Sequence, residues 1–265
     1  MRPWCTASLC VAALLIATPG HADIKRVAYP QVKVDVAAAV APEPAFMAFW
    51  EQLGGAVARR DANALFALVA PSFVWTAQGS LTAEFDPGRN ALHNFKVVFG
   101  FRQQGRDEDG GVEGGPYWDA LAQFVGDPAF YSASDKTGLI CGPLLAEVAD
   151  GAALERAQQA LTIGDDSGSW YFVAGETPVA KKPGDAGAAL ATISKVAFPV
   201  LGTYPPEQSG VATTPTHYEV LLPSGASGWI PANAARPLAN DRLCYAKTRD
   251  GAWTIAIFDQ GQADD

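Results

Sequence analysis

The sequence has few of the residues from which metal and nucleophile sites are usually built. It contains three histidines and four cysteines in 265 residues. His93 and His217, the two histidines beyond the N-terminal segment, stand far apart in the sequence. A structural zinc needs clustered Cys or His ligands, so we expect no metal site. The sequence also has no glycine-rich loop followed by Lys and Ser or Thr, the pattern that cradles phosphate, and we expect no cofactor.

Positive charge is scarce as well. The chain has 19 lysines and arginines against 28 aspartates and glutamates, which gives a formal net charge of -9. Nucleic-acid binding depends on basic side chains that displace counterions from phosphates, and anionic lipid also attracts basic segments. We therefore expect neither as a partner. Hydrophobic residues make up 49% and charged residues 18%, which is typical of a chain that folds around a core.

Long apolar runs are missing except near the N-terminus. There, Arg2 precedes the apolar stretch Leu9–Ala17, and small residues stand just before Asp23. A membrane anchor is the alternative, but spanning about 30 Å of hydrocarbon takes roughly 20 apolar residues, and this stretch is shorter. We predict that residues 1–22 are a secretory signal cleaved between Ala22 and Asp23. The mature chain is then expected in the periplasm or secreted, with no membrane span.

Export changes what the cysteines can do. Removal of the signal takes away Cys5 and Cys10 and leaves Cys141 and Cys244. In an oxidising compartment, two cysteines allow one intramolecular pairing. We predict a disulfide between them, with two buried reduced thiols as the alternative.

The mature chain opens with a segment of weak periodicity. Residues 23–45 are rich in Pro and Ala, and we expect an extended arm and linker with one strand at Lys33–Val36. From there, apolar residues recur at helical spacing, beginning with Phe46 and Phe49. We predict an α+β domain over residues 46–162.

The pattern changes after residue 162 to short apolar stretches separated by turn residues, which is typical of a small barrel. We predict such a barrel over residues 170–238. Asp250-Gly251 then stands between two alternating apolar stretches, which is a strong hairpin signal, and we expect a hairpin over 239–260. The predicted fold class is α+β, with a helical or cone-like first domain, a small all-β barrel and a closing β-hairpin.

The stretch Tyr218–Ile230 resembles the hairpin of bacterial Src-homology-3-like (SH3-like) domains. In it, alternating apolar residues lead to a turn that contains Gly225, and Gly228-Trp229 follows. We expect Gly228 to let Trp229 enter the second strand where two backbones approach closely. Residues 178–184 are similar to the opening of the same family.

This resemblance implies binding rather than catalysis, often of peptides or cell-wall ligands on an aromatic groove. The candidate ligand-binding residues are Tyr204, Tyr218 and Trp229. The alternative is that Tyr218 and Trp229 are core residues of the hairpin. Tyr204, between Thr203 and Pro205, is the better candidate for an exposed position.

Residues 46–76 resemble the start of a nuclear transport factor 2-like α+β cone, in which a long helix, a short Asp-led helix and a strand follow one another. The two stretches that flank Asp250-Gly251, Arg242–Lys247 and Trp253–Phe258, also resemble the closing strands of that family. This resemblance implies that the barrel is inserted before the final hairpin and that the hairpin packs on 46–162. Cys244 would then lie near Cys141.

We therefore predict an exported, non-catalytic cell-envelope protein that binds a peptide, a glycan or a partner protein through an SH3-like module. One alternative is a cell-wall hydrolase of the cysteine peptidase type, with Cys141 as nucleophile and His217 downstream. Others are a small-molecule pocket enzyme in the first domain and a purely structural interaction module. A filled apolar interior in the first domain favours binding, whereas a pocket with converging titratable groups favours catalysis.

Overall fold

The computed structural model describes residues 24–77, 80–101, 117–133, 138–163, 170–185, 187–206 and 214–261. The predicted signal, residues 1–22, lies outside this part of the chain. Within it the fold is mixed α+β, with five α-helices and mostly antiparallel sheets, which confirms the predicted class. None of the helices in these ranges is long and apolar enough to cross a bilayer.

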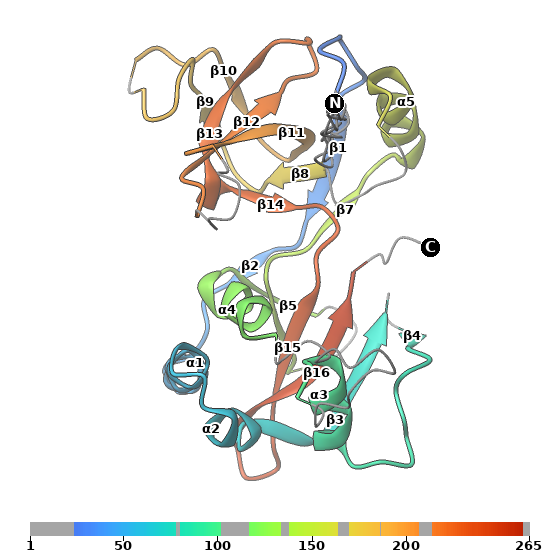
Figure 1. The fold of residues 1–265 in the computed structure, drawn as a ribbon, viewed down its shortest axis with the longest axis vertical. Helices are drawn as coiled ribbons and strands as arrows, with labels where there is room; N and C mark the ends of the chain where they lie inside the picture. Colours follow the sequence, from blue (N-terminus) through green and yellow to red (C-terminus); the bar gives the residue numbers. More distant parts are fainter. Residues whose placement is uncertain are drawn as a thin grey trace, which may run out of the picture.

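One half of the molecule is a sheet covered by helices, which we call the helical half (Figure 1). Among the described strands of this half, β3 (Val69–Ala77) and β16 (Trp253–Gln260) pair in parallel, and the other neighbours are antiparallel. In order across the sheet, the strands are β2 (Ala39–Val40), β5 (Phe130–Ser132), β6 (Ile140–Gly142), β15 (Arg242–Lys247), β16 (Trp253–Gln260), β3 (Val69–Ala77) and β4 (Ser80–Leu81).

Four helices belong to the helical half: α1 (Pro44–Ala58), α2 (Ala62–Phe66), α3 (Ala91–Val98) and α4 (Trp118–Gly126). The apolar spacing that begins at Phe46 places one face of α1 in the core. Asp61 caps α2 by accepting a hydrogen bond from the backbone N–H of Ala64 at 3.1 Å. The core between helices and sheet is dominated by aromatic rings: Phe46, Phe49, Trp50, Phe73, Phe95, Phe130, Tyr245 and Trp253.

The other half is built mainly of strands, and we call it the strand half. Its seven strands from the second part of the chain are β8 (Trp170–Val173), β9 (Thr177–Val179), β10 (Ala191–Ile193), β11 (Val196–Tyr204), β12 (His217–Leu221), β13 (Ser227–Pro231) and β14 (Ala235–Pro237). Five of them pair antiparallel in the order β14–β8–β11–β12–β13, and β9 pairs antiparallel with β10 in a separate two-stranded sheet. A short 3₁₀ turn, Ala232–Ala234, connects β13 to β14.

The closed barrel predicted here does not form among the described residues. β13 meets the chain after β9 only through an isolated bridge between Ala180 and Trp229. The reason is that β9 takes β10 as its ladder partner, and Pro178 at its centre has no N–H to give to a second strand. The strands therefore form an open, strongly curved arrangement with the β9–β10 hairpin as a flap on one side.

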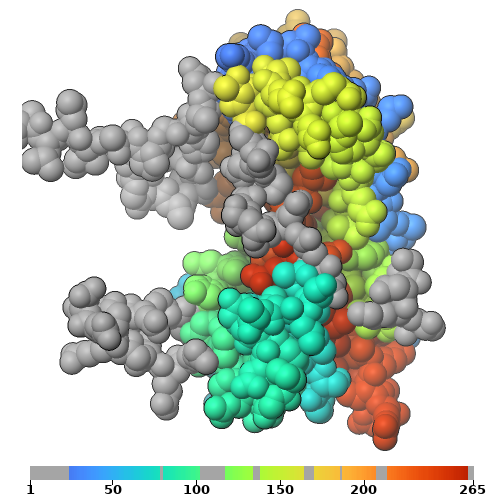
Figure 2. Space-filling view, turned by 90° about the vertical axis from the view of Figure 1, so that its right-hand side faces the viewer, coloured from blue at the N-terminus to red at the C-terminus, as the bar shows by residue number. Residues whose placement is uncertain are grey.

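Segments from the first part of the chain complete the strand half. β1 (Val32–Val36), close to the predicted strand, pairs with β11 on one side and with β7 (Ala146–Val148) on the other. Helix α5 (Gly151–Leu161) packs against this layer through Ala157 and Leu161. Figure 2 shows α5 against the N-terminal residues at one end of the molecule and α3 at the other, with the C-terminal strands between them.

The chain therefore passes between the two halves three times, before β2, after β6 and before β15 (Figure 1). A buried cluster at this junction contains Tyr131, Leu144 and the two cysteines. Arg236 of β14 also forms a two-pronged ion pair with Asp127 after α4, at 2.7 and 3.0 Å. The halves are thus joined by apolar packing and by paired charge.

The predicted disulfide is confirmed. Cys141 on β6 and Cys244 on β15 stand directly opposite each other in the sheet, with Cα atoms 4.0 Å apart, and their sulfurs are bonded. Both side chains are buried. The bond ties two strands of one sheet whose cysteines are 103 residues apart in the sequence, with most of the strand half between them.

Candidate functional site

The strand register decides how the three candidate aromatic residues lie. Tyr204 is opposite His217, and Trp229 is opposite Glu219, two residues further along the same strand. Residues opposite each other in an antiparallel ladder share a face of the sheet, and neighbours along a strand alternate. Tyr204, His217 and Trp229 therefore share one face, whereas Tyr218 points to the other.

Tyr218 packs, partly buried, against the core of the strand half. Its ring centroid lies 5.3 Å from that of Tyr171, and both rings pack against the buried cluster around Phe198 and Ile230. Burial raises the pKa of the Tyr218 and Tyr171 hydroxyls above the ordinary value of 10.0. The structure thus separates Tyr218 from the other two candidates and places it on the face of the sheet that packs against the core.

Tyr204 and Trp229 remain together, and with His217 they form what we call the aromatic face. The ring centroids of Tyr204 and Trp229 are 6.3 Å apart in an edge-to-face arrangement. Tyr204 is 49% exposed, one of the few large apolar side chains of the described residues that face solvent. A large ring held open on a hydrogen-bonded sheet offers contact area with little entropy left to lose on binding.

The β9–β10 loop, residues 180–185 and 187–190, borders the aromatic face. Gly228 allows β13 to approach the start of this loop closely, because a Cβ at that position would lie 2.5 Å from Val179 Cγ1 and 2.9 Å from the Ala180 carbonyl oxygen. The close backbone approach predicted at Gly228 is thereby confirmed. The loop carries two exposed lysines, Lys181 and Lys182, so that this border of the face is positively charged.

His217 connects the loop to the sheet, and it is not among the ligand-binding residues predicted from the sequence. The backbone N–H of Gly184 donates to His217 Nε2 at 3.2 Å. On the other side of the ring, Nδ1 lies 3.1 Å from Thr216 Oγ1, and that hydroxyl donates to the Tyr204 carbonyl oxygen at 3.0 Å. The only sequence signal was its place at the start of a strand beside Tyr218.

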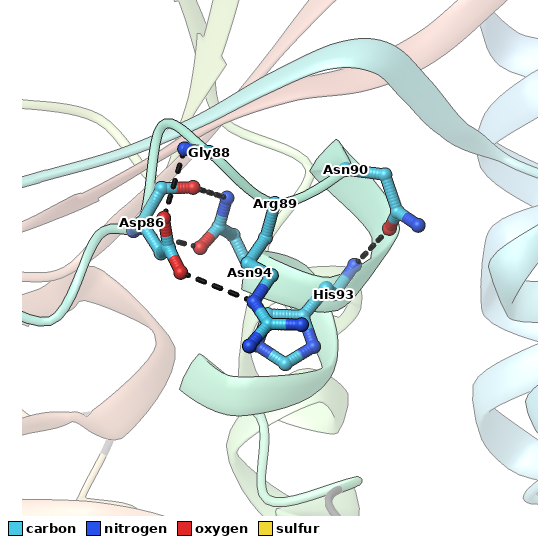
Figure 3. A network of polar contacts seen from close by, with 6 residues as sticks. All are labelled: Asp86, Gly88, Arg89, Asn90, His93 and Asn94. Atoms are coloured by element: carbon cyan, nitrogen blue, oxygen red, sulfur yellow. Dashed lines mark hydrogen bonds and ion pairs between the residues drawn. The ribbon is translucent and has the colours of Figure 1, made fainter.

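The helical half contains a polar network around the start of α3 (Figure 3). The buried side chain of Asn94 accepts from the backbone N–H of Asp86 and donates to its carbonyl oxygen, each at 3.0 Å. The Asp86 carboxylate accepts from the Gly88 N–H at 2.8 Å and pairs with Arg89 at 3.3 Å. These bonds hold the turn that precedes the helix.

His93 enters that network through its backbone, whose N–H donates to the Asn90 side chain at 2.7 Å (Figure 3). This contact is the N-terminal cap of α3. Among the described residues, the hydrogen bonds of this network involve the backbone of His93 and not its ring. The network therefore accounts for local folding and supplies no paired acid and base.

The interior of the helical half is filled with rings. Phe46 alone lies within 6.2 Å, centroid to centroid, of five other aromatic rings: Phe49, Trp50, Phe130, Tyr245 and Trp253. The Tyr245 hydroxyl is buried there with no hydrogen-bond partner among the described residues, and burial raises its pKa. Within the same described ranges, no three His, Cys, Asp or Glu side chains come together as a metal cluster.

The two residues of the peptidase alternative lie in different halves. Cys141 is buried in the sheet of the helical half, and His217 is on β12 of the strand half. The nucleophile of such an enzyme is a thiolate. Because the Cys141 sulfur is bonded to Cys244, it has no thiolate to offer in the oxidised chain.

Comparison with family models, with curated proteins and with solved structures finds no match to this chain.

Proposed function

We propose that this protein is an exported, non-catalytic protein of the cell envelope that binds a peptide, a glycan or a partner protein on the aromatic face of an SH3-like module. The observation that carries the proposal is the pair of rings on one face of a sheet beside a basic loop, an exposed Tyr204 against a half-buried Trp229. Aromatic side chains of this kind contribute most of the binding energy at many recognition surfaces.

The arrangement of strands supports the SH3-like part of the proposal. The strands β14, β8, β11, β12 and β13 are antiparallel neighbours in that order across the sheet, and a 3₁₀ turn precedes β14, the last of the five in the sequence. The hairpin with its turn at Gly225, where φ is +83°, leads directly into Gly228-Trp229. The arrangement differs from a closed barrel in one respect: where a continuous ladder would close the barrel, the described residues form the single Ala180–Trp229 bridge.

The disulfide supports export. Stable disulfides form in oxidising compartments and are rare in a reducing cytosol. The Cys141–Cys244 bond is buried in the sheet, where it acts as a structural tie.

Two observations favour binding over catalysis. The interior of the helical half is occupied by aromatic rings. The polar network around Asp86 holds the turn before α3. Cys141, the nucleophile that the alternative requires, is consumed in the disulfide.

The test is retention of the purified mature protein on purified cell-wall sacculi at moderate salt. We expect the wild-type chain to be retained and the Tyr204→Ala and Trp229→Ala variants to lose at least about 10-fold in retention, because a central aromatic anchor is typically worth about 2 kcal/mol or more. Tyr117→Ala is the matched control, since Tyr117 is a similarly exposed ring, at 54%, on the helical half.

Three results would contradict the proposal. The first is a wild-type chain that is not retained, which excludes a wall ligand. The second is a Tyr204→Ala variant retained as well as the wild type. The third is an equal loss for Tyr117→Ala, which would mean that any exposed ring suffices. Thermal unfolding of each variant separates lost binding from lost folding.

A further inference from the structure

We propose that His217 is a pH-sensitive latch, which fastens the β9–β10 loop beside the aromatic face when the ring is neutral and releases it when the ring is protonated. The effect on ligand binding rests on the proposed function above, whereas the movement of the loop does not. The geometry of three hydrogen bonds carries the inference.

The donors and acceptors around His217 fix the state of its ring. A backbone N–H can only donate, so the bond from Gly184 requires a lone pair on Nε2. The Thr216 hydroxyl spends its proton on the Tyr204 carbonyl oxygen and is left to accept from Nδ1–H. The three bonds are satisfied together by one form of the side chain, the neutral ring with its proton on Nδ1.

Protonation breaks the first of these bonds and leaves the others in place. Nε2 then carries a hydrogen that points at the Gly184 N–H, and two donors repel each other. Nδ1 already carries a proton in the neutral ring, so its bond to Thr216 survives. Histidine is the side chain that gains this charge between about pH 5 and pH 8.

The loop is tied at its ends and depends on His217 at its tip. Ala180 exchanges two backbone hydrogen bonds of 2.8 Å with Trp229, and the Leu190 N–H donates to the Val179 carbonyl oxygen at 2.8 Å. In the part of the loop that the structure describes, the remaining hydrogen bonds of the tip stay within the loop, from Asp185 to Lys182 and from Gly187 to Asp185. Releasing Gly184 therefore frees the tip while the ends stay anchored.

The charges on the neighbouring elements act on the protonated ring in both directions. The loop carries Lys181 and Lys182, which repel an imidazolium, and Asp185, which attracts it. Tyr204 on β11 faces His217 across the ladder. Glu219 lies on the same face of β12 as His217, and its carboxylate is already engaged with Arg26 at 3.1 Å and with Ser227 at 2.7 Å. On β13, Trp229 and Pro231 carry no charge.

A released loop weakens binding, because part of the border of the aromatic face must then be ordered again by the ligand. The loss of one hydrogen bond changes an equilibrium by about 3- to 10-fold. We therefore expect retention on sacculi to be about 3- to 10-fold weaker at pH 5.5 than at pH 7.5, with the loop as the element that responds.

The first experiment needs no ligand. Amide hydrogen exchange of the full mature chain is followed at pH 7.5 and pH 5.5 and corrected for the intrinsic pH dependence of exchange. We expect the Gly184 amide of the wild type to lose about 3- to 10-fold in protection at pH 5.5, while the Ala180 amide keeps its protection. In His217→Gln, the side-chain oxygen accepts at the place of Nε2 at both pH values, and protection stays. In His217→Leu it is lost at both.

His93→Gln is the matched control, because it removes the other mature histidine and leaves the loop untouched. It should behave as the wild type. Equal protection of Gly184 at the two pH values in the wild type overturns the latch, as does a pH response that persists in His217→Gln or disappears in His93→Gln.

The second experiment compares the ratio of retention on sacculi between the two pH values in the wild type and in His217→Gln. A ratio near one in the wild type, together with a Gly184 amide that opens, overturns the coupling of the latch to binding. A chain that is retained at neither pH refutes the wall ligand of the proposed function and leaves the latch to be decided by exchange alone.

Discussion

The two halves of the molecule use aromatic residues in opposite ways. In the helical half the rings of Phe46, Trp50 and Tyr245 are buried against one another in the core. In the strand half, a smaller core is covered by a sheet whose outer face carries Tyr204 and Trp229. The same residue types therefore stabilise one half and are available for recognition on the other.

The two halves also differ in the contacts that stabilise them. The helical half is closed by strands from both ends of its sequence and by the disulfide, whereas the strand half depends on β-ladders and on a segment at the start of the described chain. Tyr29 of that segment donates from its hydroxyl to the Leu221 carbonyl oxygen at 2.6 Å. The following predictions test these differences, from the largest expected effect to the smallest.

Removal of the disulfide should have the largest effect. The bond closes a loop of 103 residues, and the chain-entropy model gives about 4–5 kcal/mol for a loop of this size. We expect the Cys141→Ala/Cys244→Ala double variant to lose that much free energy of unfolding in urea denaturation. Unfolding at the wild-type urea concentration would show that the bond contributes nothing and that the ladder between β6 and β15 is sufficient.

Truncation of a buried ring should separate the two halves clearly. Phe46→Ala removes the ring at the centre of the aromatic core and should cost about 3–5 kcal/mol. Tyr204→Ala removes an exposed ring and should change the free energy of unfolding by no more than about 0.5 kcal/mol. Phe46→Leu is the control for volume. Comparable losses for Phe46→Ala and Tyr204→Ala in urea denaturation would break the distinction between a core ring and a recognition ring.

The ion pair between the halves should matter more than an exposed pair within one half. Arg236 and Asp127 are 17% and 24% exposed and share two hydrogen bonds, so Arg236→Gln should cost about 1–3 kcal/mol. Arg89→Gln disrupts the exposed pair with Asp86 and should cost less than about 1 kcal/mol. Thermal unfolding at low and high salt checks both. A larger loss for Arg89→Gln would contradict the proposed role of the junction pair.

The smallest effects should come from single hydroxyl groups. Tyr29→Phe removes the buried hydrogen bond to Leu221 and should cost about 1 kcal/mol. Tyr245→Phe removes a buried hydroxyl without a hydrogen-bond partner among the described residues and should leave the free energy of unfolding unchanged or slightly raised. Urea denaturation of the two variants measures the difference. A loss for Tyr245→Phe as large as for Tyr29→Phe would show that its hydroxyl is bonded in solution.

Local patterns predicted much of the secondary structure. The spacing from Phe46 onward is seen in α1, the Asp250-Gly251 turn joins β15 to β16, and a strand stands at Val32–Val36. Each of these depends on neighbours in the sequence, such as a helical face or a turn with φ of +87° at Gly251. The pairing of Cys141 with Cys244 was also predictable, because only two cysteines remained to be paired.

Packing between distant segments could not be predicted in the same way. The spacing of α5 indicates a helix but not its partners, and it packs with Trp170 and Phe172 of the strand half. The candidate binding site was divided for a similar reason. Tyr204, Tyr218 and Trp229 are equally aromatic, and only the register of β11, β12 and β13 places Tyr218 on one face of the sheet and the other two on the opposite face.

By itself, the sequence determined the α+β composition, the disulfide partners and the close backbone approach at Gly228, because each follows from residue chemistry or from local backbone geometry. The tertiary structure decided which strands pair, that the barrel stays open, and that His217 reaches Gly184 across a loop. Those contacts join residues far apart in the chain. Their free energy depends on burial and register, which no short stretch of sequence contains.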